Sequence, residues 1–271
     1  LFAVHMQDLL DNRLRLQNDL RHALKKEGLC IHLQPQYNKK GDITSAEALV
    51  RWEHPERGFV SPAEFIPIAE ESGLVHLLGK SVMEMVLQEL QIILEMDVSD
   101  TFRRIAINVS PWEFARTDFI DEVKGLLEKY RVPAHYLELE ITEQTLVGNF
   151  SVFSEKMKTM QQMGIHFSID DFGTGYSSLS YLKSLPVNML KIDRTFIRDV
   201  TIDKNDDAIV KTIIVMAKSL GLEVIAEGVE TREQLEFLKE NQCNLYQGYY
   251  FSKPVPVDNF IDLITQSSKE V

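Results

Sequence analysis

The sequence predicts an α/β fold: a (β/α)8 TIM-like barrel whose first strand is antiparallel. Three observations support this prediction. Eight short segments have the apolar character and length of strands, and the later ones alternate with helical patterns. The 271 residues are close to the usual size of such a barrel. A tight turn, Lys39-Lys40-Gly41-Asp42, joins the first two strands, so they are expected to form an antiparallel hairpin.

The expected elements divide the chain into a helical leader and one domain. The strands are expected at 29–37, 43–52, 104–109, 137–143, 164–168, 189–193, 223–230 and 244–250. The helices are expected at 1–26, 62–71, 73–96, 119–130, 150–163, 207–220, 231–239 and 257–265. Residues 1–26 form the leader, which either caps the domain or connects it to an upstream module. Residues 27–271 form the domain, because no linker or low-complexity stretch interrupts them.

Composition excludes several classes of protein. A net charge of −12 argues against a general binder of nucleic-acid polymers, which would present a basic face. The chain has no run of eighteen apolar residues that would predict a membrane span, and its first residues do not resemble a signal peptide. Cys30 and Cys243 have no metal-type spacing and are expected to be free thiols in a reducing compartment.

Unusual polar residues lie in or after successive predicted strands. They are Glu47, Asn108, Glu140, Asp170, Asp171, Lys191, Glu227 and Gln247. Active sites of this barrel type lie at the carboxyl ends of the strands, so we expect these side chains to meet at one mouth. Five carboxylates there would repel one another strongly without cations. Two divalent ions bridged by a shared carboxylate would resolve the repulsion, and oxygen ligands favour Mg²⁺ or Mn²⁺ over zinc. Such a pair suits phosphodiester hydrolysis.

Each of these residues taken alone also has a purely structural interpretation. Glu47 could form an ion pair with Arg51 on the same face of its strand, and Glu138 and Glu140 could lie on a solvated edge face. Asp170-Asp171 could cap a helix or form a turn. Adjacent strand residues point to opposite faces, so both aspartates can reach one point only if the strand ends and turns there. A protein kinase reading of Asp171-Phe172-Gly173 fails because the other kinase motifs are absent from this sequence.

The segment Glu47-Ala48-Leu49-Val50-Arg51 resembles the signature of the EAL-domain family of cyclic-di-GMP phosphodiesterases. The resemblance runs from about residue 10 to residue 265 and rests on a set of segments that is specific only as a whole. The other segments are Gln34-Pro35, 108–111, 140–143, 170–178, 191–193, 227–230 and Gln247-Gly248-Tyr249. The family fold is a barrel of this type with an antiparallel first strand, in agreement with the predicted hairpin.

The resemblance implies a role for each site residue. Glu47, Asn108, Glu140 and Asp170 would hold the first metal, and Asp170 would bridge to a second that Asp171 also binds. Lys191 would orient the attacking water and stabilise charge. Glu227 would be the general base or a ligand near the second metal. Gln247 would support the site, Arg51 would contact a phosphate, Gln34 a guanine edge, and Leu49 the substrate. Glu143 would hold the Gly173–Ser178 loop, which in this family links metal binding to dimerisation.

The resemblance therefore implies a hydrolase that converts cyclic di-GMP to linear pGpG with two Mg²⁺ or Mn²⁺ ions. The alternative is a catalytically silent cyclic-di-GMP receptor, which the complete set of ligands opposes. A third possibility is a domain that stays inactive until an upstream module or a dimer partner orders its loop. The expected setting is a cytoplasmic domain that forms a homodimer and follows a sensory or GGDEF domain in its parent chain.

Overall fold

The computed structural model describes residues 2–25, 28–96, 101–146, 150–173 and 182–267. In the described part of the chain, eight strands close into a barrel in the order β1-β9-β8-β7-β6-β5-β4-β2, with β2 pairing back onto β1. The pairs from β2–β4 through β8–β9 are parallel, whereas β1 is antiparallel to both of its barrel neighbours. The predicted barrel and its antiparallel first strand are confirmed.

The barrel strands are ordered along the chain as the sequence predicted. They are β1 (Leu29–Asn38), β2 (Ile43–His54), β4 (Arg104–Asn108), β5 (Leu137–Thr142), β6 (His166–Phe172), β7 (Met189–Ile192), β8 (Glu223–Ala226) and β9 (Leu245–Tyr246). Two short strands extend the sheet, β3 (Gly58–Val60) beside β2 and β10 (Val255–Pro256) beside β1. The sequence analysis missed these two, because three and two residues are too few to show a period.

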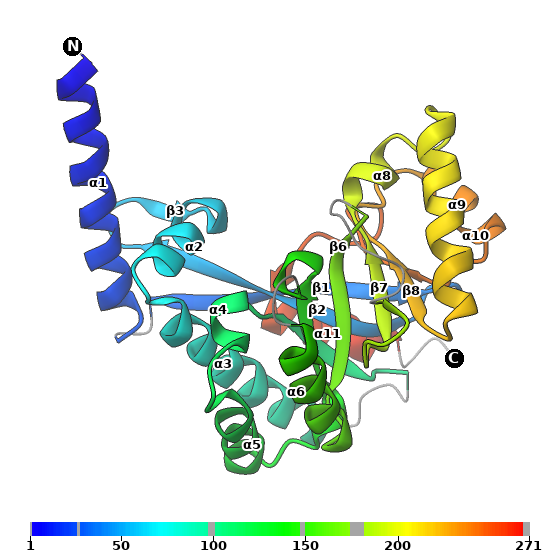
Figure 1. Cartoon of the computed structure of the whole chain (residues 1–271), viewed down its shortest axis with the longest axis horizontal. Coiled ribbons are helices and arrows are strands. Elements are labelled where there is room, and N and C mark those ends of the chain that lie inside the picture. The colour runs from blue at the N-terminus through cyan, green and yellow to red at the C-terminus, as the bar shows by residue number, and fades with distance from the viewer. Residues whose placement is uncertain (1, 26–27, 97–100, 147–149, 174–181, 268–271) are drawn as a thin grey trace.

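Helices surround the barrel (Figure 1). The longer ones are α1 (Phe2–Ala23), α2 (Pro62–Glu71), α3 (Val75–Glu95), α5 (Phe119–Tyr130), α6 (Phe150–Gln162), α9 (Lys204–Ser219), α10 (Arg232–Glu240) and α11 (Val257–Ser267). Short turns of helix, α4 (Pro111–Phe114), α8 (Arg194–Arg198), η1 (Ala134–Tyr136) and η2 (Glu143–Leu146), follow or precede strands. No described helix has both the length and the apolar character that a membrane crossing requires.

Alternation along the strands separates an apolar layer from a polar lumen. On β5 and β6, Leu139 and Phe167 point outward, and Phe167 packs edge-on against Phe114 of α4. Glu140 and Ser168, their neighbours in sequence, point into the barrel and are almost completely buried. The apolar face therefore stabilises the barrel against its helices, while the inward face is left for charged groups.

The helical leader packs on the barrel through its second half. Leu16 and Leu20 of α1 are in the hydrophobic core, and Asp19 lies 3.2 Å from Nε2 of His54 at the end of β2. The first half of α1 extends away from the rest of the molecule (Figure 1). Of the two interpretations of the leader, packing against the domain is therefore observed for the second half of α1.

Three strands end four residues away from the predicted position. Strand β8 ends at Ala226, so Glu227 lies just beyond it, and β9 contains two residues of the predicted 244–250. Strand β6 continues through Asp170 and Asp171 to Phe172. A strand of a barrel ends where its neighbouring strands no longer pair with it. A local apolar pattern in the sequence does not show where that pairing stops.

Candidate active site

The ammonium group of Lys191 is at the centre of the barrel mouth. Its Nζ lies 2.6 Å from Glu140, 2.7 Å from Glu227, 3.1 Å from Asp170 and 3.7 Å from Glu47. These carboxylates come from β2, from the paired strands β5 and β6, and from the residue after β8, and they meet in the lumen. The structure therefore brings together five of the residues that the sequence placed at the mouth. They are called the Lys191 cluster below: Glu47, Glu140, Asp170, Lys191 and Glu227.

The Lys191 cluster carries too much negative charge for one lysine to balance. When all four carboxylates are ionised, three negative charges remain uncompensated. Burial alone would lower the pKa of Lys191, but the surrounding carboxylates raise it well above its ordinary value, so the ammonium stays charged. Burial, followed by repulsion from Glu47, raises the pKa of Glu140 well above its ordinary value. Added positive charge would relieve this repulsion.

Glu47 is oriented by two side-chain amides. Asn108 Nδ2 donates to Glu47 Oε1 at 2.7 Å, and Gln247 Nε2 donates to Glu47 Oε2 at 2.5 Å. Burial would raise the pKa of Glu47, but Lys191 and these two donors hold it below its ordinary value, so Glu47 stays ionised. The alternative ion pair between Glu47 and Arg51 is not formed: Arg51 donates to the carbonyl of Val50 at 2.9 Å.

A glutamine that the sequence analysis missed fixes the orientation of Gln247. Gln36 Nε2 donates to Gln247 Oε1 at 2.9 Å, so the amide nitrogen of Gln247 faces Glu47 and also donates to Gln34 Oε1 at 3.1 Å. Gln36 is as buried as a core residue. It lies two positions after Gln34 and therefore on the same face of β1, which was the one available signal.

The two adjacent aspartates reach the mouth through an irregularity of β6, which corrects the expectation that the strand ends there. The pairing of β6 with β7 shifts register between Ile169 and Phe172, and Asp171 has a left-handed backbone with φ 53°. An aspartate tolerates this conformation better than most residues. Burial, and then Asp170, raise the pKa of Asp171 to about 6. Asp170 joins the Lys191 cluster, whereas Asp171 is exposed at its edge.

Glu227 carries a strongly basic carboxyl at the mouth. Burial raises its pKa to about 8, and repulsion from Asp170 and Glu47 adds to this effect, although Lys191 opposes it. A carboxyl with a pKa near neutrality can take up and release a proton at physiological pH, which is the property of a general base.

The residues of the mouth fit a hard divalent cation. All of the carboxylate and amide groups offer oxygen ligands, which Mg²⁺ and Mn²⁺ prefer. Glu140 Oε1, Asp170 Oδ1 and Glu227 Oε1 are buried and have no aligned hydrogen-bond donor, although the last two are near Lys191 Nζ. Among the described residues, no three acidic, histidine or cysteine side chains form a preformed metal site, because the carboxylates converge on the ammonium instead.

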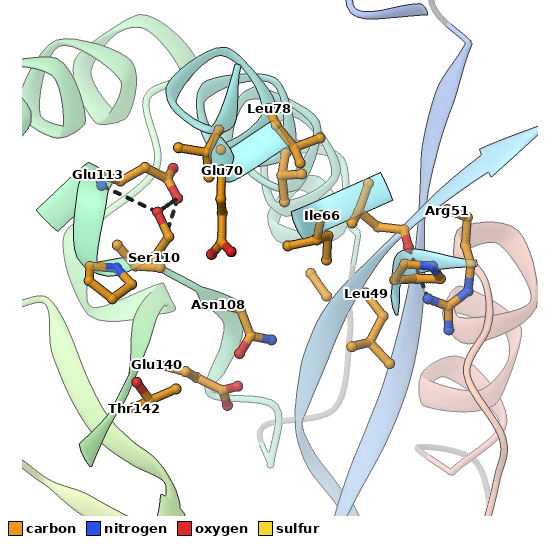
Figure 2. Close-up of a pocket in the computed structure, with 18 residues that line it drawn as sticks. Leu49, Arg51, Ile66, Glu70, Leu78, Asn108, Ser110, Glu113, Glu140 and Thr142 are labelled. Carbon is orange, nitrogen blue, oxygen red and sulfur yellow. Dashed lines mark hydrogen bonds between the residues drawn. The ribbon is translucent and has the colours of Figure 1, made fainter. Parts of the chain in front are cut away.

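A pocket of about 310 Å³ opens beside the mouth, between β2, α2, α3 and the β4–α4 corner (Figure 2). Asn108, Glu140, Leu49 and Arg51 are among the residues that line it. Burial lowers the pKa of Arg51, but its guanidinium keeps its charge. Glu70 of α2, which the sequence analysis missed, points into the middle of the pocket, and no salt bridge holds it among the described residues.

Glu138 lies two residues before Glu140 on the same face of β5 and belongs to a separate cluster. Its Oε2 accepts from Arg104 Nη1 at 3.3 Å, and both side chains are buried. The solvated edge face suggested for these two glutamates is therefore wrong, because a closed barrel has no edge there. Burial, with Arg104 and His135 nearby, lowers the pKa of His166 to about 4, so this neighbour of Glu138 is neutral at pH 7.

Glu143 is buried at the start of η2, and its Oε2 has no hydrogen-bond partner among the described residues. The loop that it is expected to hold, Gly173–Ser178, lies outside the described residues except for Gly173. Its role as a support for the loop stays a prediction.

Comparison with known proteins agrees with the geometry. The model of the EAL domain matches residues 17–254. The chain is 38% identical over 261 residues to the bifunctional diguanylate cyclase/cyclic di-GMP phosphodiesterase MucR of Pseudomonas aeruginosa, covering 96% of this chain and 38% of MucR. It is 41% identical over 246 residues to the cyclic di-GMP phosphodiesterase NbdA of the same organism, covering 90% of this chain and 31% of NbdA.

Solved structures show the same fold. The PaMucR phosphodiesterase in its c-di-GMP complex superposes with a TM-score of 0.87 at 38% identity, covering 91% of this chain and 99% of that one. The chain spans only about a third of the length of MucR and NbdA. The family model matches well over half of the chain, and both relatives exceed 30% identity. The chain therefore belongs to the EAL domain family.

Proposed function

We propose that this chain is a metal-dependent phosphodiesterase that hydrolyses cyclic di-GMP to linear pGpG. The observation that carries the proposal is the excess of negative charge in the Lys191 cluster, beside a pocket of the size that a nucleotide base needs. The names of MucR and NbdA, and the ligand in the PaMucR structure, support the choice of substrate.

Two Mg²⁺ or Mn²⁺ ions are proposed as cofactors. Glu47, Asn108, Glu140 and Asp170 would hold the first ion, and Asp170 and Asp171 the second. When bound, the ions activate water and neutralise charge at the phosphate. Glu140 Oε1 and Asp170 Oδ1, which are buried without an aligned hydrogen-bond donor, support this assignment, since such an oxygen is unfavourable.

The residues of this chain would move the protons. Glu227 would accept a proton from the attacking water as the new phosphorus–oxygen bond forms, and the raised pKa of its carboxyl suits this role. The bond between phosphorus and the ribose 3′-oxygen would break, that oxygen would take up a proton from solvent, and Glu227 would then release its own proton to solvent. Lys191 would hold Glu227, Asp170 and Glu140 in place, since its Nζ is within 3.1 Å of all three.

The pocket would bind one half of the dinucleotide. Arg51 would contact a phosphate, and Leu49, Gln34 and Gln247 would contact the substrate near the mouth. Glu70 adds a specificity element, because a carboxylate accepts two hydrogen bonds from N1–H and N2–H of a guanine edge. Ile66 and Leu78 would contact the base through apolar walls of the same pocket.

The decisive experiment is chromatographic detection of the product. Purified protein is incubated with cyclic di-GMP and Mn²⁺, Mg²⁺ or EDTA, and we expect pGpG only with a metal. Glu227→Gln keeps the shape of the side chain but not its basicity, so it should slow turnover by about 10² to 10⁴. Equal rates for this variant and the unmodified protein would exclude Glu227 as the base. Binding of cyclic di-GMP without any product would instead support a receptor.

The role of Glu70 has its own test. Glu70→Gln removes the charge and one acceptor, so KM for cyclic di-GMP should rise roughly 10-fold with kcat little changed. Discrimination against cyclic di-AMP, which lacks the guanine donors, should fall in parallel. An unchanged ratio of the two KM values would refute the contact.

Three further features of the protein are proposals. MucR is bifunctional and longer than this chain, which supports a GGDEF or sensory domain in the parent protein. A homodimer and a cytoplasmic location are carried over from the family resemblance. Analytical ultracentrifugation with and without Mn²⁺ would test the first of these two, and localisation of a tagged parent protein would test the second.

A further inference from the structure

A buried carboxylate that is not part of the Lys191 cluster lies behind the β4–α4 corner. Glu113 Oε2 accepts from the backbone nitrogen of Ser110 at 3.1 Å and from its hydroxyl at 2.6 Å. Ser110 Oγ in turn accepts from the backbone nitrogen of Glu113 at 3.2 Å. This is a capping box on α4, a helix of four residues. A helix of four residues has few backbone groups that need a cap. The hydrogen bonds of the capping box therefore mainly hold the β4–α4 corner.

The other oxygen of Glu113 rests against the backbone of α3. A methyl group on Gly79 would lie 1.4 Å from Glu113 Oε1 and 2.5 Å from its carboxyl carbon, closer than real contacts allow. Glycine in the interior of a helix is unfavourable relative to alanine. The absence of a side chain at Gly79 is therefore explained by the space that the carboxylate occupies.

The same corner carries Asn108 at the end of β4. Two anchors hold the corner: Val109 N donates to the carbonyl of Glu140 at 2.9 Å, and Ser110 donates to Glu113. Together these two hydrogen bonds set the direction in which the chain leaves β4. They therefore also set the position at which the Asn108 amide contacts Glu47.

We propose that Glu113, seated against Gly79, is a positioning residue that places the Asn108 amide against Glu47 in the site. The inference rests on the proposed role of Asn108 as a metal ligand. Partners behind the ligands of a metal commonly affect its affinity about 10- to 100-fold. Glu113 acts through the backbone of Ser110 and does not itself contact the Lys191 cluster in the described structure.

The test uses four variants: Glu113→Ala, Glu113→Gln, Gly79→Ala, and Gly79→Ala combined with Glu113→Ala. Calorimetric titration with Mn²⁺ should show affinity reduced about 10-fold in Glu113→Ala and in Gly79→Ala, whose methyl group displaces the carboxylate. Glu113→Gln keeps an acceptor for Ser110 and should retain most of the affinity. The double variant should be no worse than Glu113→Ala, because the methyl group then fills vacated space.

Crystal structures provide a readout that needs no metal. In Glu113→Ala, Asn108 Nδ2 should move out of hydrogen-bond distance of Glu47 Oε1, which is 2.7 Å in the unmodified protein. Gln234→Ala is the matched control, because it removes the same kind of cap from α10 and should lower Tm without moving Asn108. An intact contact between Asn108 and Glu47 in Glu113→Ala, or an additive loss of Mn²⁺ affinity in the double variant, would overturn the proposal. An unmodified protein that binds no Mn²⁺ would count against the metal site, and the crystal structures would still decide the role of Glu113.

Discussion

The barrel lumen holds two charged clusters that differ in their balance. At the mouth, the Lys191 cluster sets one ammonium among four carboxylates. Lower in the lumen, Arg104 faces the single carboxylate of Glu138 at 3.3 Å. Strand β5 supplies an acid to each cluster, from positions only two residues apart and on the same face.

The difference distinguishes a structural ion pair from the proposed metal site. A buried carboxylate needs a compensating charge, and Arg104 provides it for Glu138 within the protein. The Lys191 cluster has no such balance, and burial together with repulsion among its carboxylates raises the pKa values of Glu140 and Glu227. A site that is unbalanced by itself is prepared to receive positive charge from outside.

The largest expected effect follows removal of the single cation from the mouth. Lys191→Met should reduce kcat by about 10² to 10³, because a preorganised charge at the reacting group is lost. The metal-free fold should also become less stable by about 3–5 kcal/mol, since buried carboxylates lose their partner. Initial rates and urea unfolding with EDTA or Mn²⁺ measure both effects. A variant with normal kcat would mean that Lys191 is only a structural partner.

Removal of the cation from the lower cluster should affect stability alone. Arg104→Met leaves Glu138 buried and unpaired, so unfolding free energy should fall by about 3–5 kcal/mol. Combining it with Glu138→Leu should recover most of the loss, because no charge then remains to be compensated. Urea unfolding measures this, and kcat at saturating Mn²⁺ should stay close to normal in the double variant. A large fall in kcat would remove the distinction between the clusters.

The smallest expected effect is a pH dependence of Tm. The Lys191 cluster should cause it, and the pair of Arg104 and Glu138 should not. The folded pKa of Glu227 is raised to about 8 from 4.5, so its protonated form favours folding. This contribution to stability is complete below pH 4.5. It decreases steadily as pH rises from 4.5 and is lost once pH passes about 8. In EDTA, Tm should therefore fall between about pH 6.5 and 8.5.

Comparison with Glu227→Gln isolates Glu227, because burial also raises the pKa of the neighbouring Glu140. His166, with its pKa lowered from 6.5 to about 4, is already neutral in this pH range. Glu227→Gln should flatten the curve, and saturating Mn²⁺ should reverse its slope because metal ligands bind best when deprotonated. A slope that persists in Glu227→Gln would assign the pH dependence to another group.

Much of the site could be predicted because polar residues are conspicuous in buried strands. Glu140, Lys191 and Asp170 interrupt apolar segments, and the barrel brings strand ends to one mouth whatever the details of packing. Gln36, Glu70 and Glu113 could not be found in this way. Glutamine or glutamate at a strand or helix position is ordinary in a sequence, and only contacts between distant segments show that these three are buried or point into the pocket.

The sequence by itself determined the fold class, the antiparallel hairpin and the set of acids at the mouth, because periodicity and strand order are local properties of the chain. Only the tertiary structure decided how the charges are shared. Whether Glu138 faces water or Arg104, whether Glu47 pairs with Arg51 or with Asn108, and how β6 turns at Asp171 depend on which strands become neighbours when the barrel closes. Closure of the barrel brings together residues that are far apart in the chain, and local sequence patterns do not predict those contacts.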